Sequence, residues 1–292
     1  MKAMFLSGLL GWVLLSAPRG SFGAELADAS APTAIIGIDH IPLVVGNLDW
    51  AAARYRQLGF ALKPGRAHDN GLRNSHVKFP DGSGIELISP PLVAVDDLAR
   101  HYVELLAQGE GPAFLSLHAR DWPALQSMLR SGDFGFRDEG LLTLEDPDLD
   151  FLFFVQDNRS ATDKPEHFRH ANGAIAMTGV WLALGDSART GINRLLLALG
   201  ADHHIETILA PDSIETDVYR VRNGRIVVLP ERHQLRPGRP VIGAEFRVTD
   251  LSLIQQRSGS IEMESPDGDQ AQRDLLPPEA AHGIWLEFHR SP

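Results

Sequence analysis

Hydrophobic and β-branched residues occur along the chain in short runs, which are separated by turn residues and by stretches with helical spacing. The first run, residues 35–45, predicts a strand, and the apolar positions of residues 47–58 recur at the spacing of a helix. Further short runs bounded by Gly, Pro, Asn or Asp predict strands at residues 60–62, 75–79 and 84–89. The pattern therefore predicts a βαβββ module.

The same order of elements recurs three times further along the chain. Opening and closing strands of the later modules are expected at residues 112–117 and 151–156, 177–184 and 225–229, and 241–248 and 284–288. Their helices are expected around residues 121–129, 195–199 and 251–256. The chain is therefore predicted to have an α+β fold, in which four βαβββ modules pair into two halves.

The repeat also predicts the domain boundaries. Residues 34–157 form an N-terminal half with modules 1 and 2, and residues 177–292 form a degenerate C-terminal half with modules 3 and 4. Residues 158–176 connect the halves and are rich in charged and polar side chains, which is typical of a linker. Their position directly after a predicted strand indicates instead that they wrap around the first half.

The N-terminus has the pattern of a secretory signal. One lysine precedes an apolar run at residues 4–17, which is interrupted only by Ser and Gly and which ends at Pro18. Such a run is too short to span a bilayer comfortably and matches the hydrophobic region of a signal peptide. The small side chains of Ser21 and Gly23 favour removal of residues 1–23. The alternative is an uncleaved membrane anchor.

Composition narrows the choice of partner. The formal net charge is −11, and the acidic and basic residues are interspersed, which argues against nucleic acid and anionic membranes. The chain contains no cysteine, so it has neither a disulfide framework nor thiol chemistry. Together with the signal pattern, the composition favours a periplasmic or secreted protein that has no stable membrane span after processing. A small molecule is the expected partner.

One histidine and one glutamate occupy strands of the first module. His40 lies in the opening strand and Glu86 in the closing strand. An imidazole nitrogen and a carboxylate oxygen suit zinc, iron, manganese or nickel, so the pair predicts half of a divalent-metal site. The structural alternative is a histidine hydrogen-bonded beside Asp39, together with a glutamate that pairs with Arg66 or Arg73.

Several short motifs resemble those of one known superfamily. They are Ile38-Asp39-His40, Leu58-Gly59-Phe60, Gly65-Arg66-Ala67-His68 with Asn74, Gly84-Ile85-Glu86-Leu87-Ile88, and His170-Ala171-Asn172-Gly173. These motifs are similar to those of the glyoxalase and bleomycin-resistance, or vicinal oxygen chelate, superfamily, and more narrowly of its glyoxalase-like branch. The resemblance covers residues 35–173. It implies paired βαβββ modules that form a cup, whose concave face holds a metal and a chelating substrate.

The resemblance implies His40 and Glu86 as two metal ligands, from the first and last strands of one module. The later modules depart from this pattern, because Pro112, Gly179 and Gly243 stand where further ligands belong. The C-terminal half is therefore expected to be a structural copy without a metal.

Further side chains are expected to line the cup of the first half. A catalytic metal site usually has three protein ligands. His68 lies in a loop and is the best candidate for the third ligand or, if it binds no metal, for a catalytic base. Roles in substrate binding are expected for Arg66, Asn74, Phe154 and His170.

Two classes of function follow from these residues. The first is a metal-dependent lyase, isomerase or dioxygenase, in which the ion acts as a Lewis acid on a small oxygen-chelating substrate. The second is a non-catalytic protein of the bleomycin-resistance type, which binds or sequesters a small molecule in a partly aromatic cup. The sequence contains no nucleotide-binding glycine motif and no serine-hydrolase elbow.

If the signal is cleaved, the mature protein has a defined start. We expect N-terminal sequencing of protein isolated from its native host to begin near Ala24, because signal peptidase recognises the small residues that precede it. Soluble cytoplasmic protein that still begins with Met1 would contradict this expectation.

Overall fold

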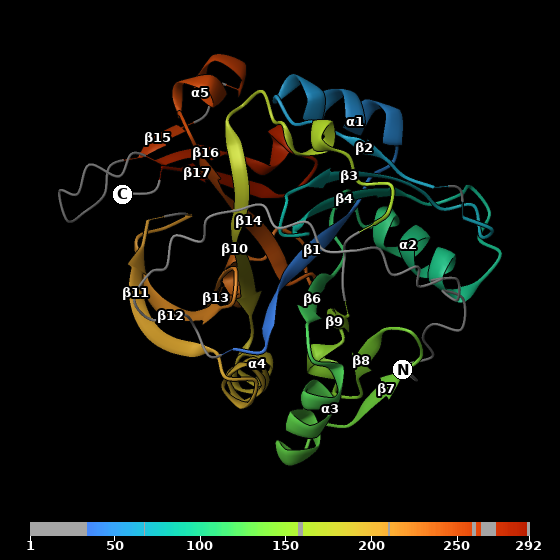
Figure 1. Cartoon of the computed structure of the whole chain (residues 1–292), viewed down its shortest axis with the longest axis vertical. Coiled ribbons are helices and arrows are strands. Elements are labelled where there is room, and N and C mark those ends of the chain that lie inside the picture. The colour runs from blue at the N-terminus through green and yellow to red at the C-terminus, as the bar shows by residue number, and fades with distance from the viewer. Residues whose placement is uncertain are drawn as a thin grey trace.

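The computed structural model describes residues 34–66, 68–156, 160–209, 211–258, 261–263 and 273–290. The predicted signal peptide, residues 1–23, lies outside these ranges. Within them, no helix has both the length and the apolar character needed to cross a membrane. The strands form two mixed sheets that lie side by side, and helices cover parts of both (Figure 1).

The N-terminal half contains the first two modules. Module 1 consists of β1 (Ile36–Val44), α1 (Leu48–Gln57), β2 (Lys63–Pro64), β3 (Arg73–Lys78) and β4 (Gly84–Ser89). Between the modules lie α2 (Asp97–Ala107) and β5 (Gly111–Pro112). Module 2 consists of β6 (Leu115–Ala119), α3 (Trp122–Ser131), β7 (Phe136–Asp138), β8 (Leu142–Leu144) and β9 (Leu152–Val155).

The C-terminal half repeats this order. Module 3 consists of β10 (Ala174–Leu184), α4 (Asp186–Ala198), β11 (Asp202–Ile208), β12 (Ile214–Val221) and β13 (Gly224–Pro230). Module 4 consists of β14 (Val241–Val248), α5 (Ser252–Ser258), β15 (Ile261–Met263), β16 (Arg273–Leu276) and β17 (Trp285–His289). The predicted α+β fold of four βαβββ modules in two halves is confirmed.

The two sheets have the same topology. In each sheet the opening strands of two modules pair antiparallel at the centre, and each also pairs parallel with the closing strand of its own module. The orders are β2-β3-β4-β1-β6-β9-β8-β7, with β5 beside β1, and β11-β12-β13-β10-β14-β17-β16-β15. Because β1 and β4 are neighbours, the strands that carry His40 and Glu86 lie next to each other, as predicted.

Polar residues start the helices at the predicted places. Asn47 accepts a hydrogen bond from the Trp50 N–H at 3.0 Å before α1, and Asp121 accepts one from the Ala124 N–H at 2.9 Å before α3. Gly59 follows α1 with φ of +87°, a conformation that glycine adopts without strain. Local sequence therefore sets these boundaries.

One predicted strand was misplaced and one helix was missed. A strand was expected at residues 60–62, but β2 lies further on, because the Ala61 N–H donates to the side chain of His170 instead of to a neighbouring strand. Helix α2 was not predicted, although Asp96 caps it by accepting from the Ala99 N–H at 2.7 Å. Its amphipathic pattern and this cap are the signals that identify it.

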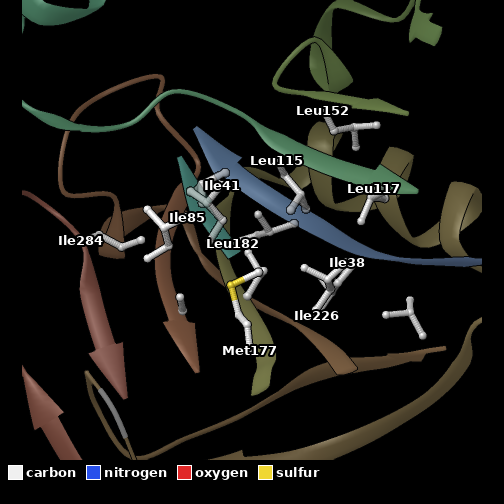
Figure 2. Close-up of a cluster of buried hydrophobic side chains, with 14 of the residues drawn as sticks. Ile38, Ile41, Ile85, Leu115, Leu117, Leu152, Met177, Leu182, Ile226 and Ile284 are labelled. Atoms are coloured by element: carbon white, nitrogen blue, oxygen red, sulfur yellow. The ribbon is translucent and has the colours of Figure 1, made fainter. Parts of the chain in front are cut away.

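One hydrophobic core joins the two halves. Side chains of the N-terminal sheet such as Ile38 and Leu115 lie in the same cluster as Met177, Leu182 and Ile226 of the C-terminal sheet (Figure 2). All five are fully buried. Burial of each such side chain contributes about 1.5–3 kcal/mol, so the halves stabilise each other.

Strand β1 contains a β-bulge at Asp39. Ile38 and His40 pair with consecutive residues of β6, which leaves Asp39 as the extra residue. Ile38 and Ile41 both point into the core although they are three positions apart. Consecutive residues of a regular strand point to opposite faces, but the bulge leaves both Asp39 and His40 away from the core.

A residue of the other half holds this bulge in place. Asn223, in the turn between β12 and β13, accepts from the Ile38 N–H at 2.7 Å and donates to the Ile38 carbonyl at 2.9 Å. Its amide nitrogen also donates to Asp81 at 2.9 Å. The side chain thus satisfies backbone groups beside the bulge.

Arg239 forms a second tie between the halves. Its buried guanidinium donates to the carbonyls of Leu105 and Gly109 at the end of α2, at 3.3 and 2.7 Å, and to that of Pro112 in β5 at 2.9 Å. Burial lowers its pKa to about 10, so the side chain stays charged at neutral pH. A cation at this helix end compensates the exposed carbonyl dipoles.

The support of the bulge can be tested by Asn223→Ala. We expect a loss of about 1–3 kcal/mol in the free energy of unfolding, because the Ile38 backbone groups lose their partners. Denaturant unfolding measures the loss, and amide hydrogen exchange at Ile38 should accelerate. Asn193→Ala is the matched control, because Asn193 accepts one hydrogen bond from Tyr219 and does not touch β1. Equal losses in both variants would contradict a special role of Asn223.

Candidate functional site

The concave face of the N-terminal sheet gathers polar side chains from three neighbouring strands. His40 in β1, Asn74 and His76 in β3, and Glu86 in β4 alternate with core residues and therefore point away from the core. The side chains of His40 and Glu86 keep 17% and 14% of their surface exposed, so solvent reaches them. These residues form the candidate site.

A chain of hydrogen bonds runs through this site. Ser116 Oγ and His40 Nδ1 each donate to Asp39 Oδ2 at 3.1 Å. On the other side of the ring, His40 Nε2 lies 3.2 Å from Glu86 Oε2, and Asn74 Nδ2 donates to Glu86 Oε1 at 2.5 Å. Because a carboxylate only accepts, both ring nitrogens of His40 carry protons in this arrangement.

The electrostatics agree with this protonation state. Burial lowers the pKa of His40, but the Asp39 and Glu86 carboxylates outweigh burial and raise it to about 10. Burial raises the pKa of Glu86, but hydrogen bonds from His40 and Asn74 hold it well below its usual range. Burial lowers the pKa of His76 to about 4. At neutral pH the site therefore contains a cationic His40, an anionic Glu86 and a neutral His76.

The site provides two of the ligands that a metal would need. Asp39 orients the ring of His40 as carboxylates orient metal-bound histidines, and Nε2 faces Glu86. In module 2, however, Ser116 and Phe153 occupy the paired positions on β6 and β9. Among the described residues, no three His, Asp or Glu side chains are grouped closely enough to hold an ion. The side chains thus do not fit a three-ligand catalytic metal, and metal binding stays a prediction.

Aromatic side chains and helix α2 bound the site. The ring of Phe153 meets His40 edge-on with centroids 5.9 Å apart, and Phe114 lies against Phe153 at 6.2 Å. Helices α1 and α2 lie on opposite sides of β3 and β4 (Figure 1). Tyr102 of α2 belongs to an apolar cluster with Val44 of β1, and burial raises its pKa well above the usual value. Helix α2 therefore packs against the apolar end of this face, while His40 and Glu86 at the polar end stay partly exposed.

The predicted loop residues lie in different surroundings. His68 is partly buried, and within the described ranges its Nε2 atom is buried without a hydrogen-bond partner. Arg66 is exposed. Gly65 lies so close to Asn74 that any Cβ atom there would overlap the amide group. Asn74 therefore contacts Glu86 in the candidate site, whereas among the described residues neither His68 nor Arg66 hydrogen-bonds to the site.

The structural alternative for the two central residues is half right. His40 does bond to Asp39, as that alternative required. Glu86, however, contacts His40 and Asn74, whereas Arg73 pairs with an exposed aspartate on α1. The two side chains therefore contact each other rather than separate partners.

Two predicted substrate-binding side chains lie away from the cup. Phe154 is fully buried in the core, and Phe153 faces the site instead, because consecutive strand residues alternate between faces. His170 accepts from the Ala61 N–H at 3.0 Å and donates to the Lys78 carbonyl at 3.1 Å, so both ring nitrogens are occupied by backbone groups. His170 thus fastens the connecting segment to module 1.

Two other polar residues of this face, Ser116 and Asp163, were not predicted. Ser116 donates to Asp39, the residue that orients His40, and this contact depends on the bulge. Asp163 of the connecting segment lies between Lys63 and Lys78, at 2.5 and 2.7 Å. Burial raises the pKa of Asp163, but hydrogen bonds from the two lysines outweigh burial and lower it. A lysine inside a predicted strand, Lys78, was the available signal in the sequence. The segment therefore packs on the first half, as its position indicated.

Comparison with protein families identifies one match. A family model described as a glyoxalase-like domain matches residues 38–191. This range covers modules 1 and 2 from β1 onward, the connecting segment, β10 and part of α4. No curated protein matches the chain by sequence.

Solved structures show the same fold at low sequence identity. A mutant of 4-hydroxymandelate synthase from Streptomyces coelicolor has a TM-score of 0.60 and 12% identity, covering 89% of this chain and 92% of that one. A variant of homoprotocatechuate 2,3-dioxygenase from B. fuscum has a TM-score of 0.59 and 13% identity, covering 91% and 75%. A xylose isomerase-like TIM barrel/4-hydroxyphenylpyruvate dioxygenase fusion protein has a TM-score of 0.61 and 12% identity; 92% of this chain aligns with 51% of it, about half its length.

The role of His170 predicts a pH dependence of stability. Burial lowers its pKa from 6.5 to about 4, so the folded state keeps it neutral while the unfolded state binds a proton below pH 6.5. Stability should therefore fall as the pH decreases from 6.5 towards 4. His170→Asn should be less stable at neutral pH by about 1–3 kcal/mol, and its stability should depend less on pH in this window. Denaturant unfolding at several pH values measures both effects. The same dependence in both proteins would contradict the assignment.

Proposed function

Because this chain belongs to the glyoxalase-like domain family of the vicinal oxygen chelate superfamily, we propose that its N-terminal cup binds a small molecule with neighbouring hydroxyl groups. One observation carries the proposal. Asn74 and Asp39 each use one side-chain atom in the hydrogen-bond chain and leave Oδ1 buried without a partner among the described residues. Two unsatisfied acceptors beside an open polar pair require donors, and hydroxyl groups are donors of suitable size.

The same residues indicate which of them donate hydrogen bonds to the ligand and which accept them. The amide nitrogen of Asn74 faces Glu86, whereas its oxygen lies beside Gly65 and has no hydrogen-bond partner among the described residues. His40 already carries both protons and donates, whereas the oxygens of Asn74 and Asp39 accept. A ligand with one oxygen that accepts from His40 and hydroxyls that donate to the other two residues satisfies all three. Phe153 supplies an apolar wall for the carbon frame of the ligand.

A proton-transfer activity of the lyase or isomerase type is a second candidate, favoured by the contact between His40 and Glu86. The proton on His40 Nε2 is shared with Glu86 Oε2 at 3.2 Å. If His40 Nε2 donated its hydrogen bond to a carbonyl oxygen of the ligand instead of to Glu86, the Glu86 carboxylate would be free. It could then accept a proton from a carbon or oxygen atom next to that carbonyl. This candidate uses the same cup and the same ligand class.

The metal-dependent alternatives, including a dioxygenase, require a third metal ligand in addition to His40 and Glu86. Relatives in this superfamily use divalent metals, but the described side chains provide His40 and Glu86 without a third ligand. We therefore favour binding that does not depend on an ion. The predicted signal peptide further leads us to propose that binding takes place in the periplasm or outside the cell.

Binding can be measured with two probes, catechol and glycerol, and with phenol and propan-1-ol as analogues that have a single hydroxyl group. Isothermal titration should show saturable binding of at least one probe and clearly weaker binding of its analogue. Asn74→Ala should weaken this binding about tenfold or more, because a buried acceptor for the ligand is lost. Asn70→Ala is the matched control, since the side chain of Asn70 already bonds to Asp96 at 3.0 Å.

A comparison of chelator-treated protein with protein supplied with zinc or manganese separates the candidates. Equal affinities are expected from ion-independent binding. Binding that needs the ion and disappears in His40→Ala would contradict it and support the metal-dependent class. Failure of both probes to bind the folded wild-type protein would contradict the proposed ligand class. Unchanged binding in Asn74→Ala, shown by circular dichroism to be folded, would contradict the role of Asn74.

A further inference from the structure

The C-terminal sheet has a polar cavity on its own concave face. The cavity measures about 230 Å³, and its lining consists of Thr178, Arg225, Glu245, Arg273, Glu287 and His289. These residues come from β10, β13, β14, β16 and β17, so the whole centre of the sheet contributes. A water molecule occupies about 30 Å³ of liquid, so the cavity holds roughly seven groups of that size.

One carboxylate of the cavity is already satisfied. Arg225 donates from Nε and Nη2 to Glu245, at 2.8 and 3.0 Å, and from Nη1 to Glu206 at 2.6 Å. Trp181 Nε1 donates to Glu245 at 2.7 Å. Burial raises the pKa of Glu245, but the Arg225 guanidinium outweighs burial and lowers it. Arg225 is therefore shared by the carboxylates of Glu245 and Glu206, and neither Arg225 nor Glu245 has much hydrogen-bonding capacity left for a ligand.

The second carboxylate of the cavity, Glu287, and the second arginine, Arg273, are less well paired. Glu287 lies beside Glu245 on the next strand, with the same register and facing the same cavity. Its partner Arg273 is 3.4 Å away, and in the described part of the chain the Nε atom of Arg273 is buried without a hydrogen-bond partner. Burial and then the charge of Glu245 raise the pKa of Glu287 to about 7. Arg273 thus has free donor capacity.

The glycines at the expected ligand positions make room for these side chains. A Cβ atom at Gly179 would overlap the carboxylate of Glu245, and one at Gly243 would lie 2.7 Å from the ring of Trp181. In the C-terminal half, the side chains of Glu245 and Trp181 thus occupy the space that a metal-binding side chain at Gly179 or Gly243 would need.

We propose that this cavity is a second ligand site, which binds a small hydroxycarboxylic acid through Arg273 and Glu287. The carboxylate of the ligand pairs with the guanidinium of Arg273, and the protonated carboxyl of Glu287 donates to it. The hydroxyl of the ligand reaches Thr178, which lies 2.8 Å from His289 Nε2. The site is independent of the N-terminal cup, because no lining residue belongs to that half.

Binding at this site is linked to proton uptake. The ionisable groups around Glu287 are Glu245, Arg225, Arg273, His289 and Glu206. Arg225 stays paired with two carboxylates, and burial lowers the pKa of His289, so Glu287 is the group that titrates near neutral pH. A bound anion raises its pKa further. Affinity should therefore be constant below pH 7 and fall, by at most about tenfold per pH unit, above it.

The test uses lactate as probe and lactamide as its uncharged analogue, titrated into the full-length protein between pH 6 and 9. We expect saturable binding of lactate, at least tenfold weaker binding of lactamide, and uptake of protons when lactate binds. Titrations in two buffers with different ionisation enthalpies measure the proton uptake. Absence of lactate binding, or equal binding of both probes, would overturn the proposal.

Single substitutions test the contributions of Arg273 and Glu287 separately. Arg273→Gln should weaken lactate binding at least tenfold, whereas Arg220→Gln, which changes an exposed arginine of the same sheet, should not. Glu287→Gln keeps a donor at the site and should bind lactate without proton uptake and without the pH dependence. If Arg273→Gln fails to fold, this second variant still decides, because an unchanged pH profile in Glu287→Gln overturns the proposal. Glu86→Gln should not alter lactate binding, so this result is separate from that of the N-terminal cup.

Discussion

The β-bulge at Asp39 is the constraint on which the N-terminal site depends. A regular strand would point Asp39 into the core or turn His40 there, because neighbouring side chains alternate. The extra residue lets both side chains lie on the concave face, where Asp39 fixes the ring of His40 and His40 faces Glu86. Asn223 of the other half bonds both backbone groups of Ile38. The packing of the halves and the geometry of the site are therefore coupled.

The four modules repeat one plan but place different chemistry on it. In the N-terminal cup, a cationic histidine lies between two carboxylates, and helix α2 packs against the apolar end. In the C-terminal cup, the apolar cluster around Trp181 fills part of the face, and Arg225 neutralises Glu245. The same sheet topology thus supports two sites with different electrostatic character, and one shared core joins the two sheets.

Residues that depend on strand alternation show where prediction succeeded and failed. His40 and Glu86 were placed correctly, because each lies on a strand whose hydrophobic neighbours define its face. Phe154 was assigned to the cup, but a shift of one position exchanges the faces, and Phe153 is the residue that meets His40. Glu245 was overlooked for a different reason, since the expected ligand position was placed at Gly243, two positions earlier on the same face.

The sequence by itself determined the modules, the helix caps and the strands that carry the two central residues, because these depend on local spacing and on side chains close in the chain. Only the tertiary structure decided the bulge, the double backbone contact of His170, and the pairing of Asp163 with two lysines. These contacts join residues that are far apart in sequence. Their geometry follows from strand register and from the packing of the halves, which no local pattern encodes.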